Sequence, residues 1–187
     1  MPADRIPALL VTGTAGAGKT TFIAKCLIQR PDGERWAVLV NDFGEATLAD
    51  ASGVPERAVF VREVAGCICC SAQVSLRTGI VALLREARPQ RLLIEASAAA
   101  HPDAVVKILR EPGIASAVAI AQMRTICVVD PAQAIDERYR ALELYCEQVQ
   151  SADVVVLSKA DLRSAEERSA AREVLLGIGA RVASECE

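Results

Sequence analysis

A glycine-rich segment near the N-terminus constrains the fold more than any other part of the chain. It reads G-T-A-G-A-G-K-T, follows the apolar run 9–11 and precedes a stretch of helical spacing, 19–29. This matches G-x-x-x-x-G-K-[ST] in the strand-to-helix context that a phosphate-binding P-loop requires. In a P-loop, backbone N–H groups and the start of the helix bind phosphate oxygens. The residues expected at the phosphates are Gly13, Thr14, Ala15, Gly16, Ala17, Gly18, Lys19, Thr20 and Thr21.

Two residues of this P-loop (residues 13–20) carry its expected chemistry. Lys19 supplies a positive charge to the β- and γ-phosphates, and Thr20 supplies a hydroxyl to Mg²⁺. Position 14 is threonine, whereas the deviant loop of partition-type ATPases carries a second lysine there, so the sequence disfavours that class. The remaining alternative is a turn that only connects a strand to a helix.

Short apolar runs alternate with stretches of helical spacing along the rest of the chain. Aromatic residues make up 3% of the sequence, so the core must consist of aliphatic residues, as in parallel sheets buried on both faces. The alternation predicts an α/β fold, a three-layer P-loop NTPase with a mostly parallel central sheet and helices on both faces. Strands are expected at 9–11, 36–40, 59–61, 91–94, 125–129 and 153–157, and helices at 19–29, 73–85, 103–110, 136–150 and 164–176. Such sheets bind ligands at the carboxyl ends of their strands.

Length and composition limit the classes of function. The 187 residues suit one domain, 1–187, and 52% hydrophobic with 24% charged residues is a globular composition. The net charge of -3 and a pI near 5.4 argue against nucleic-acid and membrane-surface partners. The longest uncharged runs, 6–18 and 64–76, are shorter than the roughly 18 apolar residues of a spanning helix. The first apolar stretch is too brief for a signal peptide, so we expect a cytoplasmic protein.

Two further motifs follow predicted strands. Glu95 ends the strand 91–94, where a carboxylate can face the Mg²⁺ shell or the attacking water beside a P-loop; the alternative is an acid facing solvent. Ser158-Lys159-Ala160-Asp161 is similar to the guanine-reading N-K-x-D motif, with serine in place of asparagine. Asp161 would accept two hydrogen bonds that guanine offers and adenine does not, and Lys159 would cover the base, which favours GTP over ATP. Ser158 lacks the amide that ties this loop down, so we expect a looser loop and weaker selection of guanine. Alternatively, Lys159 and Asp161 only cap the next helix.

An acidic segment follows the strand 36–40 and reads N-D-F-G-E. Its carboxylates also stand at the carboxyl edge of the predicted sheet, within reach of the Mg²⁺ and phosphate centre. We expect Asp42 to be a catalytic switch residue. The alternative is a turn that Asn41 or Asp42 stabilises through its own side chain.

The cysteines are unevenly placed. Three of the seven, Cys67, Cys69 and Cys70, fall within four positions of the segment G-C-I-C-C. In a reducing compartment such a cluster indicates metal binding or thiol chemistry rather than disulfides. Thiolates favour Zn²⁺, with Cu⁺, Ni²⁺ and Co²⁺ as other candidates, and an open fourth position suits transfer of the ion. Redox sensing or packing is the alternative.

The ordered motifs together resemble the CobW-type branch of the metal-handling GTPases, which also includes HypB and UreG. The resemblance covers residues 8–161, and G-C-I-C-C is its most specific part. It implies a GTP-hydrolysing metallochaperone or metal-insertion factor with a client metalloprotein and nucleotide-dependent homodimerisation. It further implies that Lys19 and Thr20 serve phosphate and Mg²⁺, that Glu95 is the Walker B acid, and that the three clustered cysteines bind the metal.

Two departures from the family pattern bear on activity. Ala98 stands where the family usually has a glycine whose amide approaches the γ-phosphate, so we expect slow hydrolysis. We also expect a single GTPase domain, 1–187, without the C-terminal domain that commonly follows it in the family. Two alternatives stay open, a nucleotide- and metal-binding regulatory module without turnover and a small-molecule P-loop kinase. Arg138 and Arg140 are the only candidates for the basic lid that a kinase needs.

Overall fold

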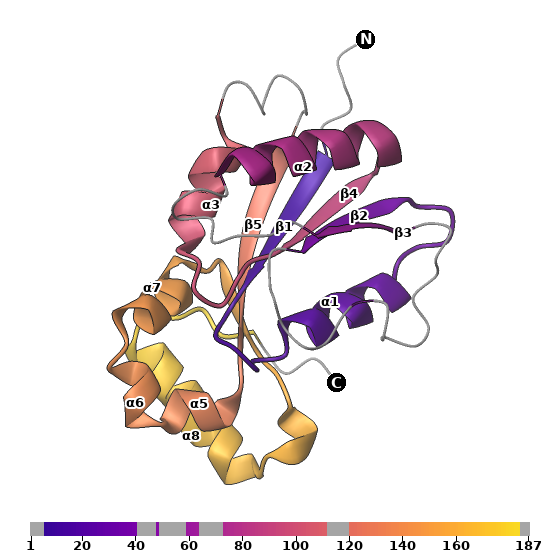
Figure 1. Cartoon of the computed structure of the whole chain (residues 1–187). Helices are drawn as coiled ribbons and strands as arrows, with labels where there is room; N and C mark the ends of the chain where they lie inside the picture. The colour runs from indigo at the N-terminus through magenta and orange to yellow at the C-terminus, as the bar shows by residue number, and fades with distance from the viewer. Residues whose placement is uncertain (1–5, 41–47, 49–58, 64–72, 112–119, 184–187) are drawn as a thin grey trace.

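The computed structural model of the chain describes residues 6–40, 48, 59–63, 73–111 and 120–183. Its centre is a six-stranded sheet in the order β3-β2-β4-β1-β5-β6, and every pair of neighbouring strands is parallel (Figure 1). The strands are β1 (Ile6–Thr12), β2 (Trp36–Val40), β3 (Val59–Glu63), β4 (Arg91–Glu95), β5 (Ile120–Val129) and β6 (Val154–Leu157). All six predicted strands and the parallel sheet are therefore confirmed.

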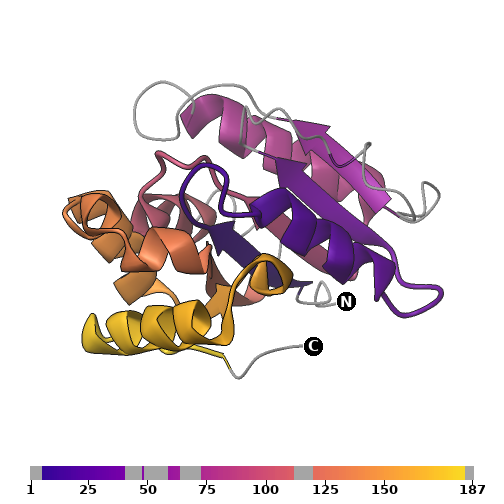
Figure 2. The same ribbon diagram turned by 90° about the horizontal axis from the view of Figure 1, so that it is seen from below.

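Helices cover both faces of the sheet, because neighbouring residues of each buried strand point to opposite sides. On one face Leu10 and Ile94 pack against α2 and α3, and on the other Val11 and Leu93 pack against α1 (Figures 1 and 2). Complete burial of such side chains contributes about 1.5–3 kcal/mol each. The helices are α1 (Lys19–Ile28), α2 (Gln73–Ala87), α3 (Pro102–Leu109), α5 (Pro131–Ile135), α6 (Glu137–Arg140), α7 (Glu143–Ser151) and α8 (Ala165–Gly177), with a 3-10 turn, η2, at Ala160–Leu162.

A third buried cluster joins the end of the sheet to the C-terminal half. Cys127, Val129 and Val155 pack against Tyr145 of α7 and Leu175 of α8. The short helix α5 packs on α8 (Figure 2). This places α5 beside the carboxyl ends of β5 and β6, at the edge of the sheet where ligands are expected.

The predicted single helix 136–150 is wrong. The structure instead has α6 and α7 there, preceded by α5, which was not predicted. Asp136 has extended backbone angles, φ -78° and ψ 121°, and its side chain accepts a hydrogen bond from Arg138 N. Leu142 is also extended, so a second break precedes α7. Side-chain capping at Asp136 separates α5 from α6, whereas the break at Leu142 has no side-chain cap, and the apolar spacing reveals neither break.

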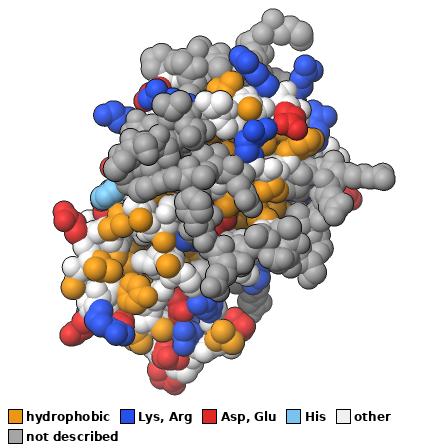
Figure 3. All heavy atoms as spheres, viewed as in Figure 1, with side chains coloured by type: hydrophobic (Ala, Val, Ile, Leu, Met, Phe, Trp, Pro, Cys, Tyr) orange, Lys and Arg blue, Asp and Glu red, His pale blue; other side chains and the backbone are white. Residues whose placement is uncertain are grey.

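In the part of the chain that the structure describes, no helix is long and apolar enough to cross a membrane. Figure 3 shows basic and acidic side chains intermixed over the visible described face.

Candidate functional site

The P-loop has the backbone that its sequence predicts. Gly13 has a φ of 137°, and a Cβ added there would lie 2.3 Å from Val128 O, so only glycine fits beside β5. Gly18 has a φ of 93° and is the N-cap of α1. The loop therefore wraps tightly between β1 and α1, and the first turn of α1 faces the space that it encloses.

Lys19 is folded inside this loop rather than extended into solvent. Its Nζ donates hydrogen bonds to Gly13 O at 3.1 Å and to Thr14 O at 3.2 Å. The side chain is buried, with 4% exposure for the residue. The ammonium group thus already lies where a P-loop holds the phosphates.

Thr20 and Glu95 come together from different elements. The hydroxyl of Thr20 donates to Glu95 Oε1 at 2.6 Å. Glu95 ends β4, opposite Val11 of β1, and is buried with 1% exposure, so the solvent-facing interpretation of this acid is wrong. A hydroxyl and a carboxylate are the oxygen ligands that Mg²⁺ takes beside nucleotide phosphates, and these two residues fit that ion. Thr21 lies next along α1 and is exposed.

The base loop (residues 158–161) contacts the P-loop directly. Ser158 Oγ donates to Ala17 O at 2.6 Å, and Ser158 N donates to Val129 O at 2.9 Å. The expectation that serine leaves this loop untied is therefore wrong, because the short hydroxyl reaches the carbonyl itself. A Cβ at Gly18 would lie 3.4 Å from Ser158 Cβ, which shows how closely the two loops pack.

The other two base-loop residues are not caps of α8. The N-cap of α8 is Ser164, which forms a capping box with Glu167. Asp161 lies in η2 and is exposed, and Lys159 has a left-handed backbone with a φ of 51°. The capping interpretation of Lys159 and Asp161 thus fails for this helix.

Sequence reasoning missed a buried carboxylate, Asp130, directly after β5. It pairs with Lys159 at 3.1 Å and with Arg163 at 3.0 Å, and its side chain is 5% exposed. Burial alone would raise the pKa of Asp130, but hydrogen bonds from Arg163, Ala132 N and Lys159 outweigh that effect and hold the pKa below its ordinary value. Asp130 also ends a strand at the carboxyl edge, so the rule that singled out Glu95 could have found it.

Sequence reasoning also missed two glutamines, of which Gln133 is half-buried and Gln148 is fully buried. Gln133 of α5 accepts a hydrogen bond from Thr14 Oγ1 at 2.7 Å and donates to Ala15 O at 3.0 Å. Gln148 of α7 is fully buried and donates to Ala98 O at 3.1 Å, which fastens the segment after β4. No local motif marks either residue, since the partners are distant in sequence.

Several predicted residues lie outside the residues that the structure describes: Asp42, Cys67, Cys69 and Cys70. Within the described ranges, no group of three or more histidine, cysteine or acidic residues could hold a metal ion. Burial raises the pKa of the Cys127 thiol to about 12, which suits packing rather than metal binding.

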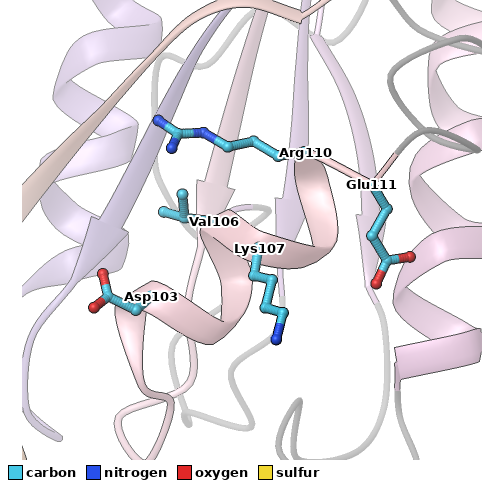
Figure 4. A pocket seen from close by; sticks show the side chains of 5 residues that line it. All are labelled: Asp103, Val106, Lys107, Arg110 and Glu111. Atoms are coloured by element: carbon cyan, nitrogen blue, oxygen red, sulfur yellow. The ribbon is translucent and has the colours of Figure 1, made fainter.

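A surface pocket on α3 lies outside these loops. Its lining mixes both charge signs, and the side chains do not converge on a common point (Figure 4). The lining residues are Asp103, Val106, Lys107, Arg110 and Glu111. None of them belongs to the P-loop or the base loop, so the pocket adds nothing to the site described above.

The sequence is similar to those of known proteins. The profile of the CobW/HypB/UreG nucleotide-binding domain matches residues 7–182. The zinc chaperone YeiR of Escherichia coli is 34% identical over 162 residues, covering 86% of this chain and 48% of that protein. The zinc chaperone CobW of a Sinorhizobium species is 31% identical over 198 residues, covering 90% of this chain and 55% of that protein. The chain thus spans about half the length of the curated relatives it matches.

Solved structures support the fold. Zn(II)-bound YjiA GTPase from E. coli superposes with a TM-score of 0.62 and 22% identity, covering 98% of this chain and 60% of that one. HypB from Helicobacter pylori in complex with nickel superposes with a TM-score of 0.58 and 19% identity, covering 95% of this chain and 77% of that one. Together with the profile match over nearly its whole length, these findings show that the chain belongs to the CobW/HypB/UreG family, whose nucleotide-binding domain it contains.

Proposed function

We propose that this chain is the GTP-binding and GTP-hydrolysing domain of a metallochaperone or metal-insertion factor that carries Zn²⁺ or a similar transition-metal ion. The observation that carries the proposal is the 2.6 Å hydrogen bond from Thr20 Oγ1 to Glu95 Oε1, which joins the P-loop to a buried strand-end carboxylate. This is the pair that P-loop NTPases use beside the β- and γ-phosphates. The relatives named zinc chaperones support the choice of cargo.

In this proposal each site residue has its own role. Lys19 neutralises phosphate charge, and the amides of the P-loop bind the phosphate oxygens. Thr20 and Glu95 would hold Mg²⁺, which when bound supplies positive charge at the β- and γ-phosphates. Asp42 serves as the switch residue that responds to the γ-phosphate. In this proposal the P-loop and these acids supply positioning and electrostatics, which dominate phosphoryl transfer.

The base loop selects guanine. Asp161 is exposed, and its carboxylate accepts from guanine N1–H and the 2-amino group. Adenine offers neither donor, so with ATP bound the Asp161 carboxylate would lie against the base without these hydrogen bonds. Ser158 keeps this loop on the P-loop through Ala17 O, which supports the same selectivity despite the missing asparagine.

The cargo site is the cysteine cluster. Cys67, Cys69 and Cys70 provide three thiolates, and water, a carboxylate or a partner protein completes the shell. Nucleotide state changes the affinity of this cluster through the segments 41–45 and 67–70, which follow β2 and β3 in sequence. The released ion passes to a client metalloprotein. A homodimer that forms in one nucleotide state is part of the same proposal, as is a single GTPase domain over 1–187.

A specific observation favours a second candidate, a nucleotide- and metal-binding module without turnover. Ala98 stands at the position of the family's glycine, and its carbonyl is held by Gln148. If this segment cannot approach the γ-phosphate, GTP binds but is not cleaved. The main proposal expects slow cleavage instead.

Phosphate release under multiple turnover separates these candidates. We expect slow release from Mg²⁺-GTP, weaker release from Mg²⁺-ATP, and loss of release in Lys19→Ala. The matched control is Lys25→Ala, an exposed lysine of the same helix that should leave the rate unchanged. Binding of GTP without release would establish the regulatory module, equal rates with ATP would contradict guanine selection, and transfer to an added small-molecule acceptor would indicate a kinase.

A further inference from the structure

The segment 130–135, which comprises Asp130 and α5, contacts both loops of the nucleotide site. Asp130, at its start, pairs with Lys159 of the base loop, and Gln133, within α5, bonds to the P-loop. Figure 1 shows α5 beside the turn that joins β1 to α1. No motif of the P-loop or the base loop includes either residue, and neither has a role in the function proposed above.

Gln133 makes two hydrogen bonds to consecutive residues of the P-loop. Its Oε1 accepts from Thr14 Oγ1 at 2.7 Å, and its Nε2 donates to Ala15 O at 3.0 Å. The same Nε2 lies 3.3 Å from Tyr139 Oη, which fixes the orientation of the amide. From inside the loop, Lys19 bonds to Gly13 O and Thr14 O. The tip of the P-loop is thus held from two sides.

This tip needs external support, because its own packing provides little. Ala15 and Gly16 are exposed, and a Cβ at Gly16 would meet no atom within 4 Å. A loop that is ordered before binding loses less conformational entropy when phosphates arrive. The two bonds from Gln133 supply that order from an element outside the loop.

Resting on the proposed nucleotide binding, we infer that Gln133 is a positioning residue of the phosphate site, which holds Thr14 and Ala15 in the conformation that binds a nucleoside di- or triphosphate. The polar hydrogens and lone pairs of its amide match both partners at once. A methionine of similar length can neither accept from Thr14 nor donate to Ala15 O. A glutamate can accept from Thr14 but cannot donate to Ala15 O.

A double-mutant cycle tests this inference on the whole chain. The variants are Gln133→Met, Thr14→Val and the pair together, and the readout is the affinity for GDP and GTP. Each lost hydrogen bond is worth about 1 kcal/mol, so we expect about a 30-fold loss for Gln133→Met, which removes two bonds, and about a fivefold loss for Thr14→Val, which removes one. The pair should lose no more than Gln133→Met alone, since both changes remove the same contact.

Gln133→Glu gives an independent readout. The added negative charge lies beside the phosphate site, so the loss of affinity should be larger for GTP than for GDP and should shrink as salt is raised. The matched control is Gln150→Met. Gln150 also donates to a backbone carbonyl, but this carbonyl is Ile178 O, after α8, and not part of the P-loop. This control should bind both nucleotides as the unchanged chain does.

The outcomes are distinct. Three results would overturn the inference while the proposed function stands. They are additive losses in the double-mutant cycle, equal nucleotide affinity of Gln133→Met and the unchanged chain, and a Gln133→Glu effect that is the same for GTP and GDP. If the unchanged chain bound neither GDP nor GTP, the proposed function would fail, and the inference with it. A melting temperature without nucleotide that is the same for Gln133→Met and Gln150→Met confirms that affinity, not folding, has changed.

Discussion

Glu95 is the residue whose burial matters most for the proposed chemistry. An unpaired buried carboxylate is costly, and this one receives a hydrogen bond from Thr20 at 2.6 Å. Glu95→Gln keeps an acceptor for Thr20 but removes the negative charge that would hold Mg²⁺. We expect Mg²⁺-dependent GTP hydrolysis to fall about 100-fold, with affinity for GDP in the absence of Mg²⁺ changed less than about twofold.

The readouts for this prediction are steady-state phosphate release and nucleotide titration in a chelator. Glu86→Gln is the control, because Glu86 is an exposed acid that pairs only with Arg62 among the contacts described for it. Its rate should match that of the unchanged chain. An unchanged rate in Glu95→Gln would remove this acid from the mechanism.

Asp161 carries the prediction on base selection. Asp161→Asn turns one acceptor of the carboxylate into a donor, which matches the 2-carbonyl of xanthine and opposes the 2-amino group of guanine. Affinity for GTP should fall about 100-fold, since hydrogen bonds to a charged group are worth about 1.5–3 kcal/mol, and xanthosine triphosphate should bind better than GTP. Competition against a fluorescent GDP analogue measures both. Retention of guanine preference would show that another residue reads the base.

At the scale of elements, the junction of β5, α5 and η2 depends on one ionised carboxylate. The pKa of Asp130 is lowered in the folded chain, where hydrogen bonds from Arg163, Ala132 N and Lys159 outweigh the burial that would raise it. A folded-state pKa below the unfolded value means that this carboxylate stabilises the fold fully above the ordinary aspartate pKa, about 3.9, and that the contribution is lost as pH falls through the lower folded-state value.

Asp130→Asn tests this dependence. The variant should lose about 2 kcal/mol of unfolding free energy at pH 7, because Arg163 and Lys159 lose their charged partner. The difference from the unchanged chain should shrink below about pH 4, where the unchanged chain loses the same contribution. Urea unfolding at several pH values measures it, with Asp32→Asn as an exposed control. A difference that stays constant down to acid pH would contradict the role of the charge.

Elements differ in how far the sequence predicts them. The strands are short β-branched or leucine-rich runs, and all six are found. The P-loop is equally local, since its glycines and Lys19 all lie within residues 13–19. The division of 131–151 into three helices depends on extended backbone at Asp136, whose side chain caps α6, and at Leu142, which makes no side-chain cap, whereas the apolar spacing across both residues still predicts a helix.

The contacts between elements were not predictable in the same way. Gln133 and Thr14 are 119 positions apart, and Asp130 and Arg163 are 33 apart. Spacing reports which face of an element a residue occupies, but not which distant loop that face meets. Ser158 is a further example. Its lack of the family's asparagine amide suggested a loose loop, but Ala17 O lies close enough to accept a hydrogen bond from the serine hydroxyl.

In the whole molecule, the proposed function requires that nucleotide state changes the metal affinity of the cysteine cluster. The most direct test is a titration of Co²⁺ into the reduced chain, followed through thiolate-to-metal charge-transfer absorbance. It is run without nucleotide, with GDP, with a non-hydrolysable GTP analogue and with an ATP analogue. The proposal predicts a strong band that is lost when Cys67, Cys69 and Cys70 are changed to serine. The midpoint of the titration should differ between GDP and the GTP analogue, whereas the ATP analogue should leave it as it is without nucleotide. The same midpoint in every nucleotide state, or no band at all, would contradict the claim.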